Sequence, residues 1–139
     1  GTVKMLQKVP GSYYAEAAAA GFDEAGPNNS QGYITHVATR ALIFIEADDP
    51  AIGLIALIPV GMAEVSSCIL AGENGHPLKE GQRVKKGEQV GYFQFGGSTH
   101  CLVLRPNVIA SFALEALPQG ANGANSAIVK VNSLLAMAQ

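Results

Sequence analysis

The chain has 139 residues, of which 48% are hydrophobic and 14% charged, and its formal net charge at pH 7 is −2. This length suits one domain with a real core, and the composition excludes a disordered chain. The small negative charge excludes a nucleic-acid partner bound through a basic surface. No run reaches the roughly 18 apolar residues that a membrane-spanning helix needs. We therefore expect a single domain over residues 1–139, and we place it in the cytoplasm.

The first half of the chain reads as strands joined by turns. Apolar and polar residues alternate over Thr2–Val9, which predicts a strand. Residues 17–32 are predicted to form an irregular loop, although their alanine run can begin a helix. Ile34–Arg40 is expected to lead into a strand over Ala41–Glu46. Its hairpin partner, Gly53–Val60, is apolar on both faces, which is typical of a central strand.

The second half predicts shorter strands. One is expected within Gly61–Leu70, and the glycine turns of residues 78–91 are similar to those of barrel-sandwich modules, where short strands wrap around a small core. Ile109–Leu117 predicts a strand or a short helix, and Ala127–Val131 is expected to pair with Leu134–Ala136. Together these elements predict a mainly β fold, at most α+β, built as a short-stranded, barrel-sandwich-like sheet.

The most informative stretch is Tyr92–His100, with the sequence YFQFGGSTH. An alternating aromatic segment runs into a Gly-Gly-Ser-Thr turn, and a second apolar run follows without a spacer. Because glycine has no Cβ, the carbonyl of Gly97 is open to approach. The residues alone leave two interpretations open, a tight β-turn and a Gly-Ser bond that cleaves itself.

Several other chemistries fit the sequence poorly. The histidines and cysteines are not at metal-ligand spacing, so no metal site is expected. A phosphate-binding loop needs a glycine turn that opens a helix, whereas Gly96-Gly97 is expected to open a strand. A serine hydrolase needs Gly-x-Ser-x-Gly between strand and helix, and the sequence has neither the second glycine nor the helix. Cys68 and Cys101 are expected to be buried free thiols, with a disulfide left open.

Internal serine chemistry remains. The hydroxyl of Ser98 would attack the carbonyl carbon of Gly97 and form an ester by an N→O acyl shift. Loss of the α-proton of Ser98 would eliminate the ester, and hydrolysis of the resulting dehydroalanine would leave a pyruvoyl group on residues 98–139. Such a carbonyl condenses with an amine and acts as an electron sink, so pyridoxal phosphate is not expected. The natural reaction is an amine-forming decarboxylation.

The same stretch resembles the processing site of the phosphatidylserine decarboxylase family, whose usual form is Leu-Gly-Ser-Thr. The resemblance covers nearly the whole chain and implies a pyruvoyl-dependent proenzyme. Its β-chain part would be residues 1–97 and its α-chain part residues 98–139. The other segments that agree in order and spacing are Val9–Tyr14, Arg40–Glu46, Ile52–Val60, Val60–Ser67 and Val84–Glu88.

Two departures from the usual pattern point to one branch of this family. Gly96 replaces Leu, and Met62-Ala63-Glu64 replaces Ala-Thr-Asn. Together with Phe44–Asp48, they look like the soluble fungal branch that includes the tryptophan decarboxylase of psilocybin biosynthesis. This resemblance implies a free L-amino acid as substrate, best an aromatic one such as tryptophan.

Two alternatives remain. The first is phosphatidylserine, recognised by its headgroup and decarboxylated to phosphatidylethanolamine by the same chemistry. The second belongs to another class, a non-enzymatic barrel-sandwich module for docking or carrying. That module would need a lysine at a hairpin tip, flanked by Met or Asp, which the sequence lacks.

Four side chains join Ser98 and Gly97 as candidate site residues. Glu64 lies among apolar residues, where a carboxylate needs a partner such as a substrate ammonium, unless it faces outward on a strand. Met62, in the same segment, is also assigned to substrate binding. Phe95 either packs in the core or lines the pocket. His100 shares a strand face with Ser98 and is either an acid/base or a structural residue.

In the resembling family, a His of a His-x-Pro-x-x-Gly motif activates the serine, and an upstream Asp orients that His. Gly1 looks like the last glycine of this motif, and neither the His nor the Asp is in the sequence. The resemblance therefore implies that the chain is the C-terminal portion of a longer proenzyme whose upstream part supplies both residues. Whether the Gly97-Ser98 bond is intact stays open.

Overall fold

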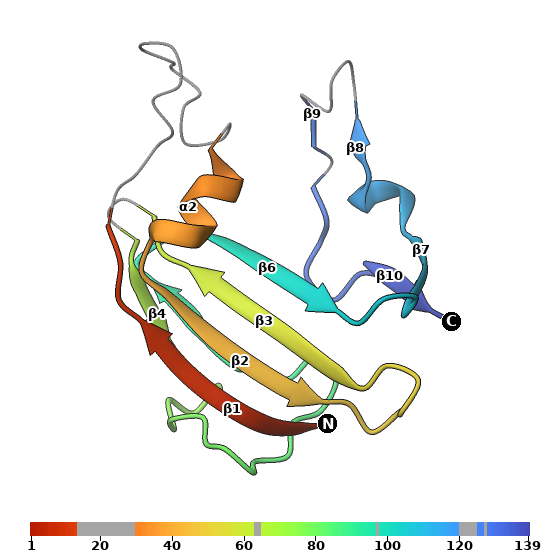
Figure 1. The fold of residues 1–139 in the computed structure, drawn as a ribbon, viewed down its shortest axis with the longest axis horizontal. Helices are drawn as coiled ribbons and strands as arrows, with labels where there is room; N and C mark the ends of the chain where they lie inside the picture. Colours follow the sequence, from red (N-terminus) through yellow and green to blue (C-terminus); the bar gives the residue numbers. More distant parts are fainter. Residues whose placement is uncertain (14–29, 63–64, 97, 120–124, 127) are drawn as a thin grey trace.

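The computed structural model of the chain describes residues 1–13, 30–62, 65–96, 98–119, 125–126 and 128–139. Its centre is an antiparallel four-stranded sheet in the order β1-β2-β3-β6 (Figure 1). The strands are β1 (Thr2–Val9), β2 (Arg40–Glu46), β3 (Leu54–Val60) and β6 (Thr99–Leu104). The predicted strands in the first half are confirmed. The third of them is central, as its two apolar faces indicated.

The hairpin between β2 and β3 depends on one glycine and one arginine. Gly53 has a φ of +63°, which favours glycine. The Arg105 guanidinium donates hydrogen bonds to the carbonyls of Pro50 (2.7 Å), Ala51 (3.2 Å) and Ile52 (3.2 Å). A Cβ on Gly53 would lie 2.4 Å from that guanidinium. The turn therefore closes on the side chain that follows β6.

The helix α2 (Gln31–Val37) packs against one face of the sheet, at the end where β3 finishes (Figure 1). Ile34 and Ala38 lie four residues apart and are buried together with Val60. The predicted loop up to residue 32 is therefore wrong at the described residues 31–32, and the segment from Ile34 that leads into the strand begins within this helix. The rest of that loop prediction lies largely outside the described residues.

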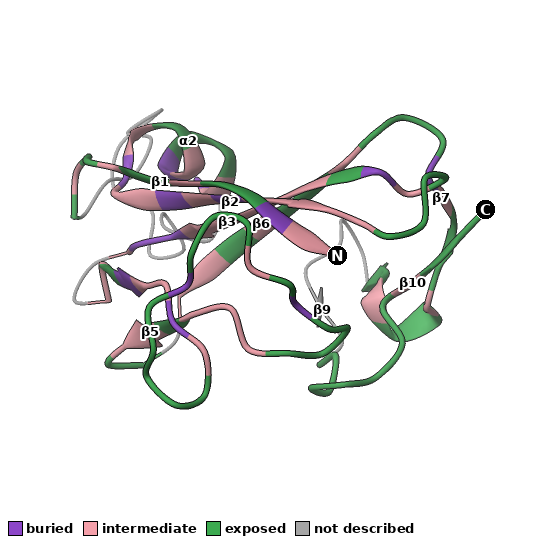
Figure 2. Cartoon of the chain, turned by 90° about the horizontal axis from the view of Figure 1, so that it is seen from below, coloured by how far each residue is buried: buried purple, intermediate pink, exposed green. Residues whose placement is uncertain are grey.

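Residues 66–94 cover the opposite face of the sheet, so that the sheet lies between this segment and α2 (Figure 2). Within the segment, β4 (Ser67–Ile69) pairs antiparallel with β5 (Tyr92–Gln94). Leu78 and Val84 complete a core with Val3 and Ile43. The strand expected within residues 61–70 is confirmed only as the short β4. The two predicted glycine turns, at residues 81 and 87, both have positive φ.

The C-terminal part forms two small pairs of strands, β7 with β10 and β8 with β9. The predicted strand or short helix over residues 109–117 contains both kinds of element, a strand and a 3-10 helix. The predicted pairing of residues 127–131 with 134–136 is wrong over the described residues 128–131, because β10 pairs with β7 and residues 128–135 are exposed. Residue 127 lies outside the described residues. The elements are β7 (Ile109–Phe112), η1 (Leu114–Ala116), β8 (Pro118–Gln119), β9 (Asn125–Ser126) and β10 (Ala136–Ala138).

The predicted fold class is confirmed. The described strands form a mainly β structure of small antiparallel sheets, and among them no barrel closes. None of the helices in the described residues has the length and hydropathy to cross a membrane.

Candidate active site

Ser98 stands directly before β6 and is held by a single hydrogen bond of its side chain. Its hydroxyl donates to the backbone carbonyl of Val60, the last residue of β3, at 2.5 Å. Thr99, the next residue, pairs with Val60 in the sheet. The serine is therefore positioned by the two central strands, at the point where the glycine turn enters the sheet.

This hydrogen bond determines what the Ser98 hydroxyl can do. A hydroxyl has one proton to donate and two lone pairs, so donation to Val60 leaves both lone pairs available for attack. A backbone carbonyl is no general base, however, and does not remove the proton. Activation of Ser98 as a nucleophile therefore requires a base other than its partner in the structure.

Of the neighbouring turn, Gly96 is described and Gly97 is not. Gly96 has a φ of +104°, and a Cβ there would lie 3.3 Å from Cγ2 of Val65. Both the backbone conformation and the close approach favour glycine at this position. Gly97 and Glu64, two of the predicted site residues, lie outside the described residues, so their roles stay predictions.

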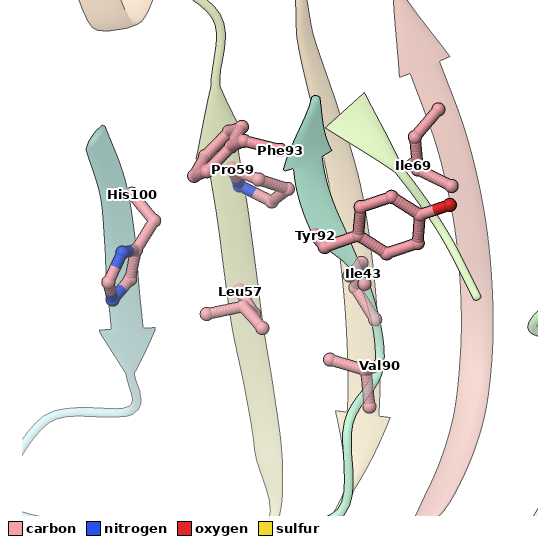
Figure 3. Close-up of a pocket in the computed structure, with 9 residues that line it drawn as sticks. Ile43, Leu57, Pro59, Ile69, Val90, Tyr92, Phe93 and His100 are labelled. Carbon is pink, nitrogen blue, oxygen red and sulfur yellow. The ribbon is translucent and has the colours of Figure 1, made fainter. Parts of the chain in front are cut away.

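A cavity of about 210 Å³ lies between the sheet and the β4–β5 strand pair (Figure 3). Nearly all of its lining is apolar, and its polar side chains are Tyr92 and His100. On the sheet side it is lined by Ile43, Leu57, Pro59 and His100. On the side of the β4–β5 strand pair it is lined by Ile69, Val90, Gly91, Tyr92 and Phe93.

On β6 the wall of the cavity reaches to within two residues of Ser98. His100 pairs with Pro59 in the register of β6 and β3, and both line the cavity. Val60, which follows Pro59, holds the Ser98 hydroxyl. At about 3.3 Å per residue along a strand, Ser98 lies roughly 7 Å from His100. The candidate nucleophile thus lies two residues from an exposed imidazole that lines the cavity, and Ser98 itself is not among the lining residues.

The structure places the other predicted residues elsewhere. Met62 is half-buried and packs with Ile34 and Val60, in the cluster beneath α2 rather than on the cavity side of the sheet. Phe95 is 83% exposed. A core position for Phe95 is therefore wrong, and neither residue lines the cavity. Their assignment to substrate binding stays a prediction.

Most of the residues that line the cavity were not among the predicted site residues. Alternate residues of a strand share a face, so Leu57 and Pro59 were recognisable as neighbours on one side of β3. Tyr92 and Phe93 are adjacent in a strand, where neighbouring side chains point to opposite faces, yet both line the cavity. No signal in the sequence indicated that Ile69 and Val90 line the cavity from the side of the β4–β5 strand pair.

The two cysteines are free thiols, as predicted, with Cys68 buried and Cys101 half-buried. Burial raises the pKa of the Cys68 thiol, whose Sγ donates to the Pro59 carbonyl at 3.6 Å. Cys101 lies on the α2 side, 3.7 Å from Oγ1 of Thr35. In the part of the chain that the structure describes, no three His, Cys, Asp or Glu side chains gather as metal ligands.

Comparison with known proteins gives one consistent result. The family model described as phosphatidylserine decarboxylase matches residues 1–127. The decarboxylase iboD of Amanita muscaria is 39% identical over 98% of this chain and 38% of its own length. The L-tryptophan decarboxylase of Psilocybe cubensis is 33% identical over 98% of this chain and 30% of its own length.

A third relative is named for a different substrate. The phosphatidylserine decarboxylase proenzyme 2 of Komagataella phaffii is 35% identical over 88% of this chain but only 10% of its own length. The chain spans about a third of the length of the two fungal decarboxylases named first, at 38% and 30%.

Proposed function

Because the chain belongs to the phosphatidylserine decarboxylase family, we propose that it is the processing and substrate-binding portion of a pyruvoyl-dependent amino-acid decarboxylase. The observation that carries the proposal is the position of Ser98. Its hydroxyl is oriented by the Val60 carbonyl directly after the glycine turn, two residues before His100, which lines the apolar cavity.

In the proposed processing, the oxygen of Ser98 attacks the carbonyl carbon of Gly97. Its proton goes to a base, and the former peptide nitrogen becomes an amine when the ester forms. Removal of the α-proton of Ser98 then expels the Gly97 carboxylate. Water replaces the nitrogen as ammonia leaves, so the products are residues 1–97 and a chain of residues 98–139 with a pyruvoyl group at its start.

The base for this step is expected from the upstream part of the same proenzyme. The Val60 carbonyl cannot serve, as argued above, and the length of the fungal relatives leaves room for a further part. A His there, oriented by an Asp, would accept the proton of Ser98. The upstream part is therefore a partner that this chain needs for maturation.

Once formed, the pyruvoyl group supplies the electron sink for loss of carbon dioxide from an amine-bearing acid. The residues of this chain bind and orient the substrate around it. His100 lines the cavity two residues after Ser98, which supports a role for its imidazole in moving a proton at the substrate's α-carbon.

The proposed substrate is a free L-amino acid with an aromatic side chain, such as tryptophan. Two relatives that cover 98% of the chain support it, one of them named for tryptophan. Phosphatidylserine is the second candidate, because a phosphatidylserine decarboxylase covers 88% of the chain at 35% identity. A free amino acid is a soluble substrate, and the cytoplasm stays the predicted compartment.

The test is an intact-mass measurement on the protein expressed with its upstream part. We expect two fragments that meet at Gly97 and Ser98, with the smaller one blocked to Edman sequencing and reactive toward hydroxylamine. The Ser98→Ala variant should stay one chain. A wild-type protein that remains whole with its upstream part restored would overturn the proposal. Decarboxylation assays with tryptophan and with phosphatidylserine vesicles then separate the two substrates.

A further inference from the structure

We infer that the 210 Å³ cavity between the sheet and the β4–β5 strand pair receives the side chain of the substrate and selects an uncharged ring system. The inference rests on the proposed function and adds to it a binding pocket with named walls. It follows from the position, the chemistry and the size of the cavity.

The position of the cavity suits a side-chain pocket. Pro59 and His100 line it and form a register pair, and the next pair along the sheet is Val60 with Thr99. The hydroxyl of Ser98 donates a hydrogen bond to the carbonyl of Val60, just beyond the cavity. A substrate whose α-carbon lies at residue 98 would therefore have its side chain directed between the sheet and the β4–β5 strand pair, past the imidazole of His100. Figure 3 shows the side chains that line this space.

The lining selects against charged side chains. Among the residues that the structure describes, the lining has no carboxylate, ammonium or guanidinium group, and its polar side chains are those of Tyr92 and His100. A charged side chain would lose its hydration on entry without gaining a partner of opposite charge. An indole or phenyl ring loses far less, because it replaces water against Leu57, Ile69 and Val90.

The size of the cavity sets an upper limit on the side chain. A cavity of about 150 Å³ in a protein core is known to hold a benzene molecule. The cavity described above, at about 210 Å³, is larger and suits one ring or two fused rings. It is smaller than the roughly 300–1,000 Å³ of pockets for drug-sized ligands, which suits a single side chain rather than a larger molecule.

The experiment measures binding rather than activity, so that it does not depend on the pyruvoyl group. The protein is the full chain with its upstream part and the Ser98→Ala substitution, which keeps it uncleaved. The probe is indole, titrated by calorimetry. Inorganic phosphate and methylammonium serve as charged probes of similar or smaller size, and neither is expected to bind in the cavity.

Two identical substitutions at different places test the location. Val90→Phe fills the cavity and is expected to weaken indole binding at least tenfold. Val103→Phe adds the same atoms on the other face of β6, where Val103 is 52% exposed, and is expected to change the affinity less than twofold. Equal effects of the two substitutions, or none from Val90→Phe, would overturn the inference.

A third variant covers the case in which Val90→Phe does not fold, as judged by circular dichroism. Leu57→Ala enlarges the cavity and is expected to raise the affinity for 3-ethylindole relative to indole several-fold. An unchanged ratio counts against the pocket.

The outcome is separable from that of the proposed function. If the wild-type protein matures and decarboxylates tryptophan but none of these substitutions affects indole, the pocket is wrong and the activity stands. If the wild-type protein fails to mature while the variants shift indole binding as described, the activity is wrong and the cavity is a ring-binding site.

Discussion

The hydroxyl of Ser98 and the carbonyl of Val60 are 2.5 Å apart, and this contact ties the glycine turn to the most buried end of β3. Val60 has no exposed surface and packs under α2. Its carbonyl is therefore held by a rigid part of the sheet. A reacting group attached to regular structure keeps a narrower range of positions than one on a free loop. The position of Ser98 next to His100 follows from this arrangement.

His100 gives the first prediction. If it moves a proton in the decarboxylation, His100→Ala should lower kcat by about 10²-fold or more, because positioned acid/base groups contribute about 10²–10⁴-fold. Self-cleavage at Ser98 should proceed as before. His76→Ala, in an exposed loop, is the control and should leave kcat unchanged. Steady-state kinetics on the matured variants measures both. A matured His100→Ala protein with kcat within twofold of wild type would assign the residue a structural role.

Gly91, which precedes β5 and lines the cavity, gives the second prediction, on the stability of the fold. A Cβ at this position would lie 2.5 Å from the carbonyl oxygen of Ile69, a backbone atom that cannot turn away. Gly91→Ala should therefore lower the free energy of unfolding by about 1–3 kcal/mol, the usual cost of overpacking. Gly72→Ala is the matched control, because its Cβ would find its nearest atom, the Gln89 carbonyl, at 3.8 Å.

Urea unfolding of both glycine variants in the uncleaved Ser98→Ala background provides the measurement. The Gly72→Ala change should stay within about 0.5 kcal/mol, as for surface substitutions in general. Equal stability of the two variants would mean that β4 and β5 approach each other less closely than the structure has it.

The strands of the central sheet were predictable because each carries its own signal. Thr2–Val9 alternates, and Arg40–Glu46 and Leu54–Val60 are apolar runs separated by a short turn. The helix α2 was not, because its seven residues include Gly32 and the β-branched Ile34, Thr35 and Val37. Such residues have weak helix propensity, and burial of Ile34 against Val60 overrides it.

The candidate site was predictable only in part, for a similar reason. Ser98 stands in a motif of adjacent residues and was found from the sequence. The cavity is assembled from β3, β4, β5 and β6, whose contacts depend on the register of strands far apart in the chain. Residues such as Ile69 and Val90 look like any core position until that register is known.

Cys68 gives the third prediction. The thiol is buried, and burial raises its pKa, so that less thiolate forms at a given pH than in an unfolded chain. Because the thiolate is the reactive form, iodoacetamide should modify Cys68 at least about tenfold more slowly in the folded protein than in urea at pH 8. Peptide mapping separates Cys68 from Cys101. Labelling of Cys68 at equal rates in the folded and unfolded protein would contradict its burial.

The ion pair of Asp48 with Arg83 gives the last prediction, a dependence of stability on pH. The guanidinium of Arg83 donates to both carboxylate oxygens, at 2.6 Å and 2.8 Å. This hydrogen bonding lowers the pKa of Asp48 from its usual value of 3.8. The folded state therefore holds the proton less tightly than the unfolded state. The contribution is present above the unfolded pKa and is lost as the pH falls through the lower, folded one.

Asp48→Asn should accordingly lower the Tm by a few degrees at most at pH 7, since both side chains are exposed and the solvent screens the pair. The difference from wild type should vanish in acid, below the folded pKa of Asp48, and should shrink at pH 7 in 1 M sodium chloride. Glu73→Gln, in an exposed loop, removes the same charge elsewhere and is the control. A difference for Asp48→Asn that persists in strong acid would mean that the substitution acts through packing rather than through the charge of the carboxylate.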